Sequence, residues 1–168
     1  DLKRARFHFE QAVALAPDLP EAHAGLGNVQ QMLGDLPGAE THYRMAISLD
    51  QDDAGAHFNL AMLLRRTGRT GEALASLRRA RDAAPGMEEA AWELVQVLRE
   101  TNRLDEARAV AGQFLADNPG SAKAHKAVGQ VLLSCHEPQV ALNRFRAALE
   151  IDPGDPDTLL NFGIAAQE

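Results

Sequence analysis

The sequence predicts an all-α fold in which antiparallel helix pairs stack into a solenoid. The same residue types return every 34 positions without insertion or deletion, and a fixed period of this size marks a repeat architecture. Between the repeated positions, apolar residues are spaced three and four apart, which is the spacing of amphipathic helices. Turn residues or proline separate consecutive apolar segments, so each repeat should contain two helices.

Small and large residues occupy fixed columns of the repeat. One column holds alanine throughout, namely Ala5, Ala39, Ala73, Ala107 and Ala141. Another holds large apolar residues, namely Leu26, Leu60, Leu94, Val128 and Phe162. A third holds Pro17, Pro85, Pro119 and Pro153, and Gln51 interrupts it. The distance between packed helices depends on the side chains at the contact, so we expect the alanine column to lie where the two helices of a repeat cross.

Ten helices follow from these columns in chain order. We expect them near residues 2–15, 21–33, 38–49, 55–67, 72–84, 89–101, 106–117, 123–135, 140–151 and 157–167. The turn inside each repeat centres on Gly34, Gly68, Asn102 or His136. Such a turn needs a residue that tolerates positive φ, which glycine does freely and asparagine often does. Proline then ends each repeat because it cannot continue a helix.

One repeat departs from the pattern of large and small residues. Where the other repeats have a large residue followed by a small one, this repeat has Ala111 followed by Phe114. Val95 in the same repeat is also bulkier than Gly27, its counterpart in an earlier repeat. We interpret the exchange as compensating repacking that keeps the total core volume.

These columns and turns resemble the tetratricopeptide repeat, a 34-residue helix-turn-helix unit. The resemblance covers the whole chain and implies a right-handed superhelical solenoid over residues 1–168. It divides the chain into full repeats at 20–53, 54–87, 88–121 and 122–155, with half repeats at 1–19 and 156–168. Both ends lack the polar capping helices usual in solenoids, so we expect a fragment of a longer chain.

Composition narrows the classes of partner. The formal net charge of −7 argues against a nucleic-acid partner, although arginines cluster at several helix ends. No apolar run is long enough for direct membrane insertion. Cys135 is the only cysteine, which favours a cytoplasmic location and leaves a periplasmic one as the alternative. The alanine- and arginine-rich bias hints at a bacterial source.

The sequence offers no catalytic, metal or cofactor site. His23, His57 and His125 share one column and His8 and His42 another, but equivalent residues of stacked repeats lie roughly 10 Å apart. A zinc ion needs its ligands about 2.0–2.1 Å away, so packing is the better interpretation of these histidines. Phosphate-binding loops, nucleophile elbows and paired-cysteine motifs are absent, and we expect no enzyme activity in this segment.

The resemblance implies that the first helix of each repeat lines a concave groove that binds a protein or peptide. The residues that would face the groove mix amides, cations and large apolar groups. They are Asn28, Gln31, Phe58, Asn59, Met62, Arg65, Arg66, Trp92, Gln96, Arg99, Lys126 and Gln130. We expect Phe58, Met62 and Trp92 to lie side by side and to anchor the partner. Burial of Phe58 and Trp92 between adjacent first helices is the alternative.

Two binding modes of tetratricopeptide repeats do not transfer to this chain. Asn28 and Asn59 match the amide positions of the subfamily that grips chaperone carboxylates, but glutamates such as Glu93 occupy positions that need cations. A second subfamily runs an unbroken asparagine ladder along its groove. Here Asn59 and Asn161 fit, whereas Gly25, Glu93 and Ala127 interrupt the ladder.

The function predicted is therefore a non-catalytic scaffold for protein–protein interaction. One alternative is the substrate-recruiting arm of a larger enzyme such as a glycosyl- or sulfotransferase. Another is homotypic assembly, with self-association through exposed end faces of the solenoid.

Overall fold

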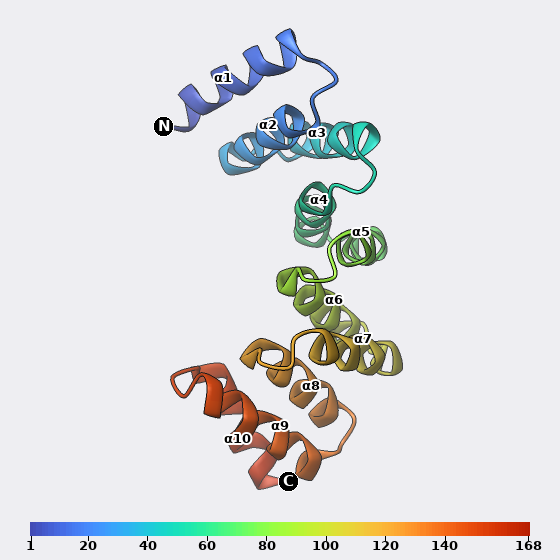
Figure 1. The fold of residues 1–168 in the computed structure, drawn as a ribbon, viewed down its shortest axis with the longest axis vertical. Coiled ribbons are helices and arrows are strands. Elements are labelled where there is room, and N and C mark those ends of the chain that lie inside the picture. The colour runs from blue at the N-terminus through green and yellow to red at the C-terminus, as the bar shows by residue number, and fades with distance from the viewer. The chain divides into compact units, whose positions relative to one another are not determined.

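The structure is a computed structural model that describes residues 1–168 and contains ten α-helices and no strands (Figure 1). In chain order the helices are α1 (Leu2–Leu15), α2 (Pro20–Leu33), α3 (Leu36–Leu49), α4 (Ala54–Arg66), α5 (Thr70–Ala83), α6 (Glu88–Glu100), α7 (Leu104–Asp117), α8 (Ala122–Ser134), α9 (Pro138–Ile151) and α10 (Pro156–Gln167). They form two compact units, Asp1–Ala84 with α1–α5 and Pro85–Glu168 with α6–α10. The predicted all-α class is confirmed. No helix combines the length and the apolar content needed to span a membrane.

The helix bounds differ from the predicted ones by up to two residues. The second helix of each full repeat begins two residues earlier than predicted, for example at Leu36 where we expected residue 38. The tight turn leaves no spare residues before the next helix. Pro37 and Pro138 lie in the first turn of α3 and α9, where a backbone N–H has no helical partner and proline is tolerated.

The turns inside the repeats share one backbone geometry. Gly34, Gly68, Asn102 and His136 have φ values of 88°, 77°, 56° and 58°, so the predicted positive-φ positions are confirmed. In each turn the next residue donates its backbone N–H to the carbonyl five residues earlier. These bonds are Asp35 to Gln30 at 2.9 Å, Arg69 to Leu64 at 2.9 Å, Arg103 to Leu98 at 2.8 Å and Glu137 to Leu132 at 2.9 Å. They satisfy carbonyls at the helix end that would otherwise lack a donor.

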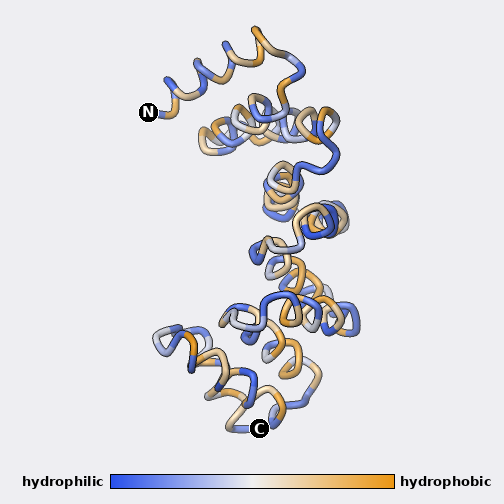
Figure 2. Tube along the Cα trace, in the orientation of Figure 1, coloured by the Kyte–Doolittle hydropathy of each residue, from blue (hydrophilic) through white to orange (hydrophobic).

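Apolar and polar stretches alternate along the helices (Figure 2). Small residues let the two helices of a repeat approach closely. Ala39, Ala73, Ala107 and Ala141 are fully buried. A Cβ atom at Gly27 would lie 2.8 Å from the Tyr43 ring. These four alanines therefore lie in the core, as expected, whereas Ala5 of α1 in the same column is only half-buried.

The exceptional repeat in the second unit buries both exchanged residues. Ala111 and Phe114 are both buried, as is Val95 on the preceding first helix. Val95 and Ala111 occupy the columns that hold Gly27 and Tyr43 in the first unit. The larger of the two residues is therefore on the first helix in this repeat, whereas it is on the second helix in the earlier one. This burial fits the predicted repacking.

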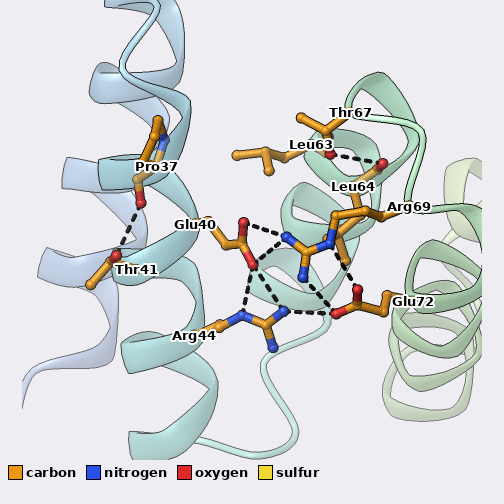
Figure 3. Close-up of polar contacts among 9 residues, drawn as sticks. All are labelled: Pro37, Glu40, Thr41, Arg44, Leu63, Leu64, Thr67, Arg69 and Glu72. Atoms are coloured by element: carbon orange, nitrogen blue, oxygen red, sulfur yellow. Dashed lines mark hydrogen bonds and ion pairs between the residues drawn. The ribbon is translucent and has the colours of Figure 1, made fainter.

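Four charged side chains join α3 to α5 in the first unit (Figure 3). Arg69, in the turn before α5, contacts Glu40 of α3 and Glu72 of α5, both at 2.7 Å. Arg44 of α3 contacts the same two carboxylates at 2.9 and 3.0 Å. The hydrogen bonds from Arg69 hold the pKa of Glu40 below its usual range, against a smaller opposing effect of burial, and Arg44 adds to the lowering.

The second unit places a similar ion pair in the same columns with reversed charges. Arg108 of α7 pairs with Glu137 in the turn before α9. These residues stand two repeats after Glu40 and Arg69, respectively. The two units therefore share the position of the bridge and differ in its polarity.

Replacing Glu40 with glutamine should lower the free energy of unfolding by about 1 kcal/mol at neutral pH, because networked charges contribute more than isolated surface pairs. A carboxyl group whose pKa is lowered by folding stabilises the protein above its unfolded-state pKa, and this contribution is lost as the pH falls through the folded-state pKa. The difference between wild type and variant should therefore disappear on acidification. Urea unfolding over a pH series measures both effects.

Glu10→Gln is the matched control for this experiment. Glu10 forms an exposed pair with Arg6 one helical turn away, and the side chains are 49% and 51% exposed. Such pairs contribute about 0.3–0.5 kcal/mol. Equal losses from the two substitutions would show that the four-residue network adds nothing beyond a single exposed pair.

Candidate functional site

The exposed sides of neighbouring first helices form a continuous surface within each unit. In the first unit α2 contacts α4, and in the second unit α8 contacts both α6 and α10. We call this surface the first-helix face: the exposed side of α2 and α4 in one unit and of α6, α8 and α10 in the other. All twelve groove residues predicted from the sequence belong to these helices.

In the first unit, two of the predicted amides contact one tyrosine, and a third amide bonds to one of those two. The Tyr43 hydroxyl contacts Asn28 Oδ1 at 2.8 Å and Gln31 Oε1 at 2.9 Å. Asn59 of α4 donates from Nδ2 to the same Asn28 oxygen at 3.0 Å. Asn28 thus links its own helix α2 to α3 and α4, and the amides of neighbouring repeats meet at the surface.

Tyr43 belongs to a large apolar column of the repeat that also holds Phe9, Leu77 and Phe145. Sequence reasoning expected such large residues to pack between helices and missed the polar role of Tyr43. Its ring is buried, as predicted for the large apolar column, and burial raises the pKa of the hydroxyl to about 12. Arg66 opposes this rise to a smaller extent. The signal was present in the sequence, because a buried tyrosine usually needs a hydrogen-bond partner and Phe9 and Phe145 in the same column do not.

The apolar and basic candidates of the first unit lie on α4. Phe58 and Met62 are half-buried, whereas Arg65 is partly exposed and Arg66 exposed in the last turn of the helix. Cations at this end of a helix interact favourably with its dipole, which gives both arginines a structural role. Trp92 belongs to the other unit, so its predicted position beside Phe58 and Met62 stays a prediction.

In the second unit, Trp92 and Lys126 lie against each other. The Lys126 ammonium is 5.1 Å from the centre of the Trp92 ring and 2.8 Å from Asp155 Oδ2. Asp155 also accepts the backbone N–H of Thr158 at the start of α10. The hydrogen bond from Lys126 lowers the pKa of Asp155, and those from Thr158 lower it further. Sequence reasoning missed Asp155, which only the stacking of α8 and α10 brings to Lys126.

The remaining predicted residues of the second unit form one hydrogen-bonded cluster. Arg99 Nη1 donates to Gln96 Oε1 at 2.8 Å and to Gln130 Oε1 at 3.0 Å. Arg99 Nε donates to the Ser134 hydroxyl at 3.2 Å, and Gln96 donates to Gln130 at 3.1 Å. The cluster ties α6 to α8, and Ser134 is the member that sequence reasoning did not include.

The first histidine column has a structural role in closing the loops between repeats. The Nε2 atoms of its members contact backbone carbonyls six residues earlier. The pairs are His23 with Pro17 at 2.9 Å, His57 with Gln51 at 3.0 Å and His125 with Pro119 at 3.2 Å. This geometry fits the packing interpretation, and it occupies the Nε2 atom of each ring.

Two histidines from different columns come together in the first unit. His23 and His42 contact each other through their Nδ1 atoms at 3.0 Å with stacked rings. Burial lowers the pKa of His42, and the neighbouring His23 lowers it further, against a weaker opposing effect of Asp35. No group of three or more potential metal ligands forms around them or elsewhere.

A pocket of about 450 Å³ is lined by residues of α3, α4, α5 and the loop after α3, and by none of the predicted groove residues. Ile47 and Leu60 contribute apolar surface, and Arg44, Arg79 and Asp52 contribute charge. The interrupted proline column at Gln51 lies at its edge. Nothing in the periodic pattern signals this pocket, because residues of three helices and a loop form it together.

Two tetratricopeptide repeat models match the chain, one at residues 1–54 and 33–88 and the other at residues 64–131. A search of curated proteins finds no match. One similar solved structure is that of YrrB, a tetratricopeptide protein "with an unusual peptide-binding site". It is 21% identical to this chain, with a TM-score of 0.77, and the alignment covers 95% of this chain and 82% of the YrrB chain. MamA is 20% identical to this chain, with a TM-score of 0.79. The alignment covers 91% of this chain and 90% of the MamA chain.

A thermophilic tetratricopeptide protein of Thermus thermophilus is 23% identical to this chain, with a TM-score of 0.69. The alignment covers 99% of this chain and 91% of the Thermus protein. At these identities the similarity concerns the fold. The fold is that of a protein-interaction scaffold, in which stacked repeats present extended binding surfaces. The matched repeats cover more than half of the sequence, and the chain belongs to the tetratricopeptide repeat family.

Proposed function

We propose that the chain binds an extended peptide or a helix of a partner protein along its first-helix face, without catalysing a reaction. The observation that carries this proposal is the pairing of amides from successive repeats at the surface, Asn28 with Asn59 and Gln96 with Gln130. A side-chain amide can donate and accept hydrogen bonds at once, and these amides use only part of that capacity. A row of such groups suits recognition of a peptide backbone.

Apolar side chains beside the amides would supply much of the affinity. Phe58 and Met62 are half-buried in one unit, and Trp92 is half-buried in the other. Lys126 lies over the Trp92 ring and fixes its orientation, which lowers the entropy lost on binding. Tryptophan and arginine dominate the energetics of many protein interfaces, so Trp92 is the strongest single anchor.

The peptide-binding site described for YrrB supports this use of a similar fold. The two alternatives drawn from the sequence stay predictions, namely recruitment of substrates to a larger enzyme and self-association through end faces. Self-association would use the exposed apolar side chains of α10, which include Leu159, Leu160 and Ile164.

Selection of short peptides from a random displayed library on the purified chain tests the proposal. Binding of the selected peptides is then measured by fluorescence anisotropy with wild type, Trp92→Ala and the double variant Gln96→Ala/Gln130→Ala. We expect each variant to bind about tenfold more weakly or worse, since that factor corresponds to about 1.4 kcal/mol, the size of one or two lost contacts.

Gln113→Ala/Gln139→Ala is the matched control, because both glutamines are exposed on the second helices α7 and α9. It makes the same chemical change away from the first-helix face. The affinity should stay within about twofold of wild type, a change in binding free energy below about 0.5 kcal/mol. Failure to select any peptide, or equal weakening by the face and control variants, would refute the proposed binding face.

A further inference from the structure

Three histidines of one repeat column differ in what surrounds their second ring nitrogen. His23, His57 and His125 each contact a backbone carbonyl through Nε2. A carbonyl only accepts hydrogen bonds, so Nε2 carries the proton and Nδ1 of the neutral ring has a lone pair. In each of the three repeats, Nδ1 therefore needs a hydrogen-bond donor.

His42 supplies this donor in the first of these repeats. Its Nδ1 atom lies 3.0 Å from Nδ1 of His23, and the two rings stack with their centres 5.3 Å apart. Because Nδ1 of His23 accepts the hydrogen bond, Nδ1 of His42 carries the proton. The N–H group of one imidazole thus completes the hydrogen bonding of the other, buried one.

The equivalent donor is missing at His57. Ser76 occupies the column of His42 one repeat later, and its short side chain forms no hydrogen bond with His57. The His57 side chain is buried at 8% exposure, and its Nδ1 atom has no partner. This atom is not enclosed, in contrast to the unpartnered Nδ1 atom of His125. A molecule from outside the fold can therefore donate to it.

His57 and Ser76 both line the pocket of about 450 Å³ described above. The Nε2 contacts of His23 and His57 are equivalent, so the two rings have the same orientation and Nδ1 of His57 points towards Ser76. The pocket therefore includes the position that the His42 ring fills in the preceding repeat. Its volume is within the range of about 300–1,000 Å³ that is usual for ligand sites, and Leu60 adds apolar surface for a ring.

Two further pocket residues carry charges that no other side chain neutralises. Arg79 on α5 and Asp52 in the loop after α3 are exposed, and neither forms an ion pair. Arg44 also lines the pocket, but Glu40 and Glu72 neutralise it (Figure 3). The pocket therefore offers one cation and one anion, which suits a ligand that carries both charges.

We propose that this pocket binds a small zwitterion with an N–H heteroaromatic ring, of which the free amino acid histidine is the simplest example. The ring would take the place that His42 has in the preceding repeat and donate its N–H to Nδ1 of His57. The carboxylate of the ligand would pair with Arg79, and its ammonium group with Asp52. The site shares no residue with the predicted groove and does not depend on peptide binding there.

Isothermal titration calorimetry at about pH 8, where free imidazole groups are mostly neutral, measures the affinity for histidine and three analogues. Ring-methylated histidine lacks the N–H donor, and histamine lacks the carboxylate. N-acetyl-histidine amide lacks both charges and represents a histidine within a polypeptide. We expect saturable binding of histidine with a dissociation constant of about 1 mM or lower. The ring-methylated and the blocked forms should bind at least about tenfold more weakly.

Substitutions locate the binding in this pocket. Ser76→His refills it with an imidazole, as in the preceding repeat, and should weaken histidine binding by at least about tenfold. Val110→His is the matched control, because Val110 belongs to the same column but lies on α7 of the second unit, and the affinity should stay within about twofold of wild type. Arg79→Gln should weaken binding of histidine by about tenfold and binding of histamine by less than about twofold.

Nitrogen-15 NMR of the imidazole groups identifies the contacted atom, since the resonance of His57 Nδ1 should shift when the ligand donates to it. Circular dichroism checks that Ser76→His remains folded; if it does not, the analogues and Arg79→Gln still decide the outcome. Absence of saturable binding, or equal binding of histidine and its ring-methylated or blocked form, would overturn the proposal. Unchanged affinity in folded Ser76→His would do the same. None of these results alters the test of the first-helix face.

Discussion

Replacing Phe145 by alanine should lower the free energy of unfolding by about 3–5 kcal/mol. Phe145 is fully buried in the core of the second unit, where it packs with Leu132, Ala141 and Ala165. Truncation removes the burial of a whole aromatic ring and leaves a cavity that the surrounding helices can only partly fill. Urea unfolding measures the loss.

Phe7→Ala is the matched control, because the side chain of Phe7 on α1 is 55% exposed. The same truncation there should cost less than about 0.5 kcal/mol. Hydrogen exchange adds a positional test. Repeats contact only their neighbours, so Phe145→Ala should increase exchange most in α8, α9 and α10. A loss below about 1 kcal/mol, or increased exchange spread evenly over the chain, would contradict the packing described for this unit.

Replacing Gly129 by valine should also destabilise the protein, by about 1–3 kcal/mol, through overpacking. A Cβ atom at position 129 would lie 2.5 Å from Phe145 Cε1 and 2.8 Å from its Cδ1. The ring cannot move aside because it is fully buried, so α8 and α9 would have to separate. Thermal unfolding of the variant measures the cost.

Gly163→Val provides the control in the same repeat column. Gly163 lies inside α10, and a Cβ atom there would have no atom within 4 Å. Because valine favours helix slightly more than glycine does, we expect a change within about 0.5 kcal/mol, towards greater stability. Similar losses at both positions would mean that helix propensity, and not the contact with Phe145, explains the effect at Gly129.

Much of the architecture could be predicted from the residue pattern because it depends on local interactions. Ala39 marks a helix crossing because only a small side chain fits there, and its complete burial agrees. Asn102 and His136 were assigned to turns from their column, and both have positive φ. The helix starts were less accurate, because a start depends on how the preceding turn closes.

The candidate site could be predicted only in part. The column positions placed Asn28, Gln96 and Arg99 on first helices, but no pattern indicated that Tyr43 or Ser134 would bond to them. Hydrogen bonds between repeats depend on side-chain conformations and on the rotation of each helix. Periodicity does not contain that information.

The sequence by itself determined the repeat, its two helices, the positive-φ turns and the columns of small and large residues. Each follows from steric limits on one residue or on residues a helical turn apart. Only the tertiary structure decided which charges are neutralised. Lys126 meets Asp155 across two helices, whereas Arg99 meets only neutral acceptors, although both were predicted as groove cations of the same kind. Electrostatic energy depends on distance and on exposure to water, and both are properties of the folded chain.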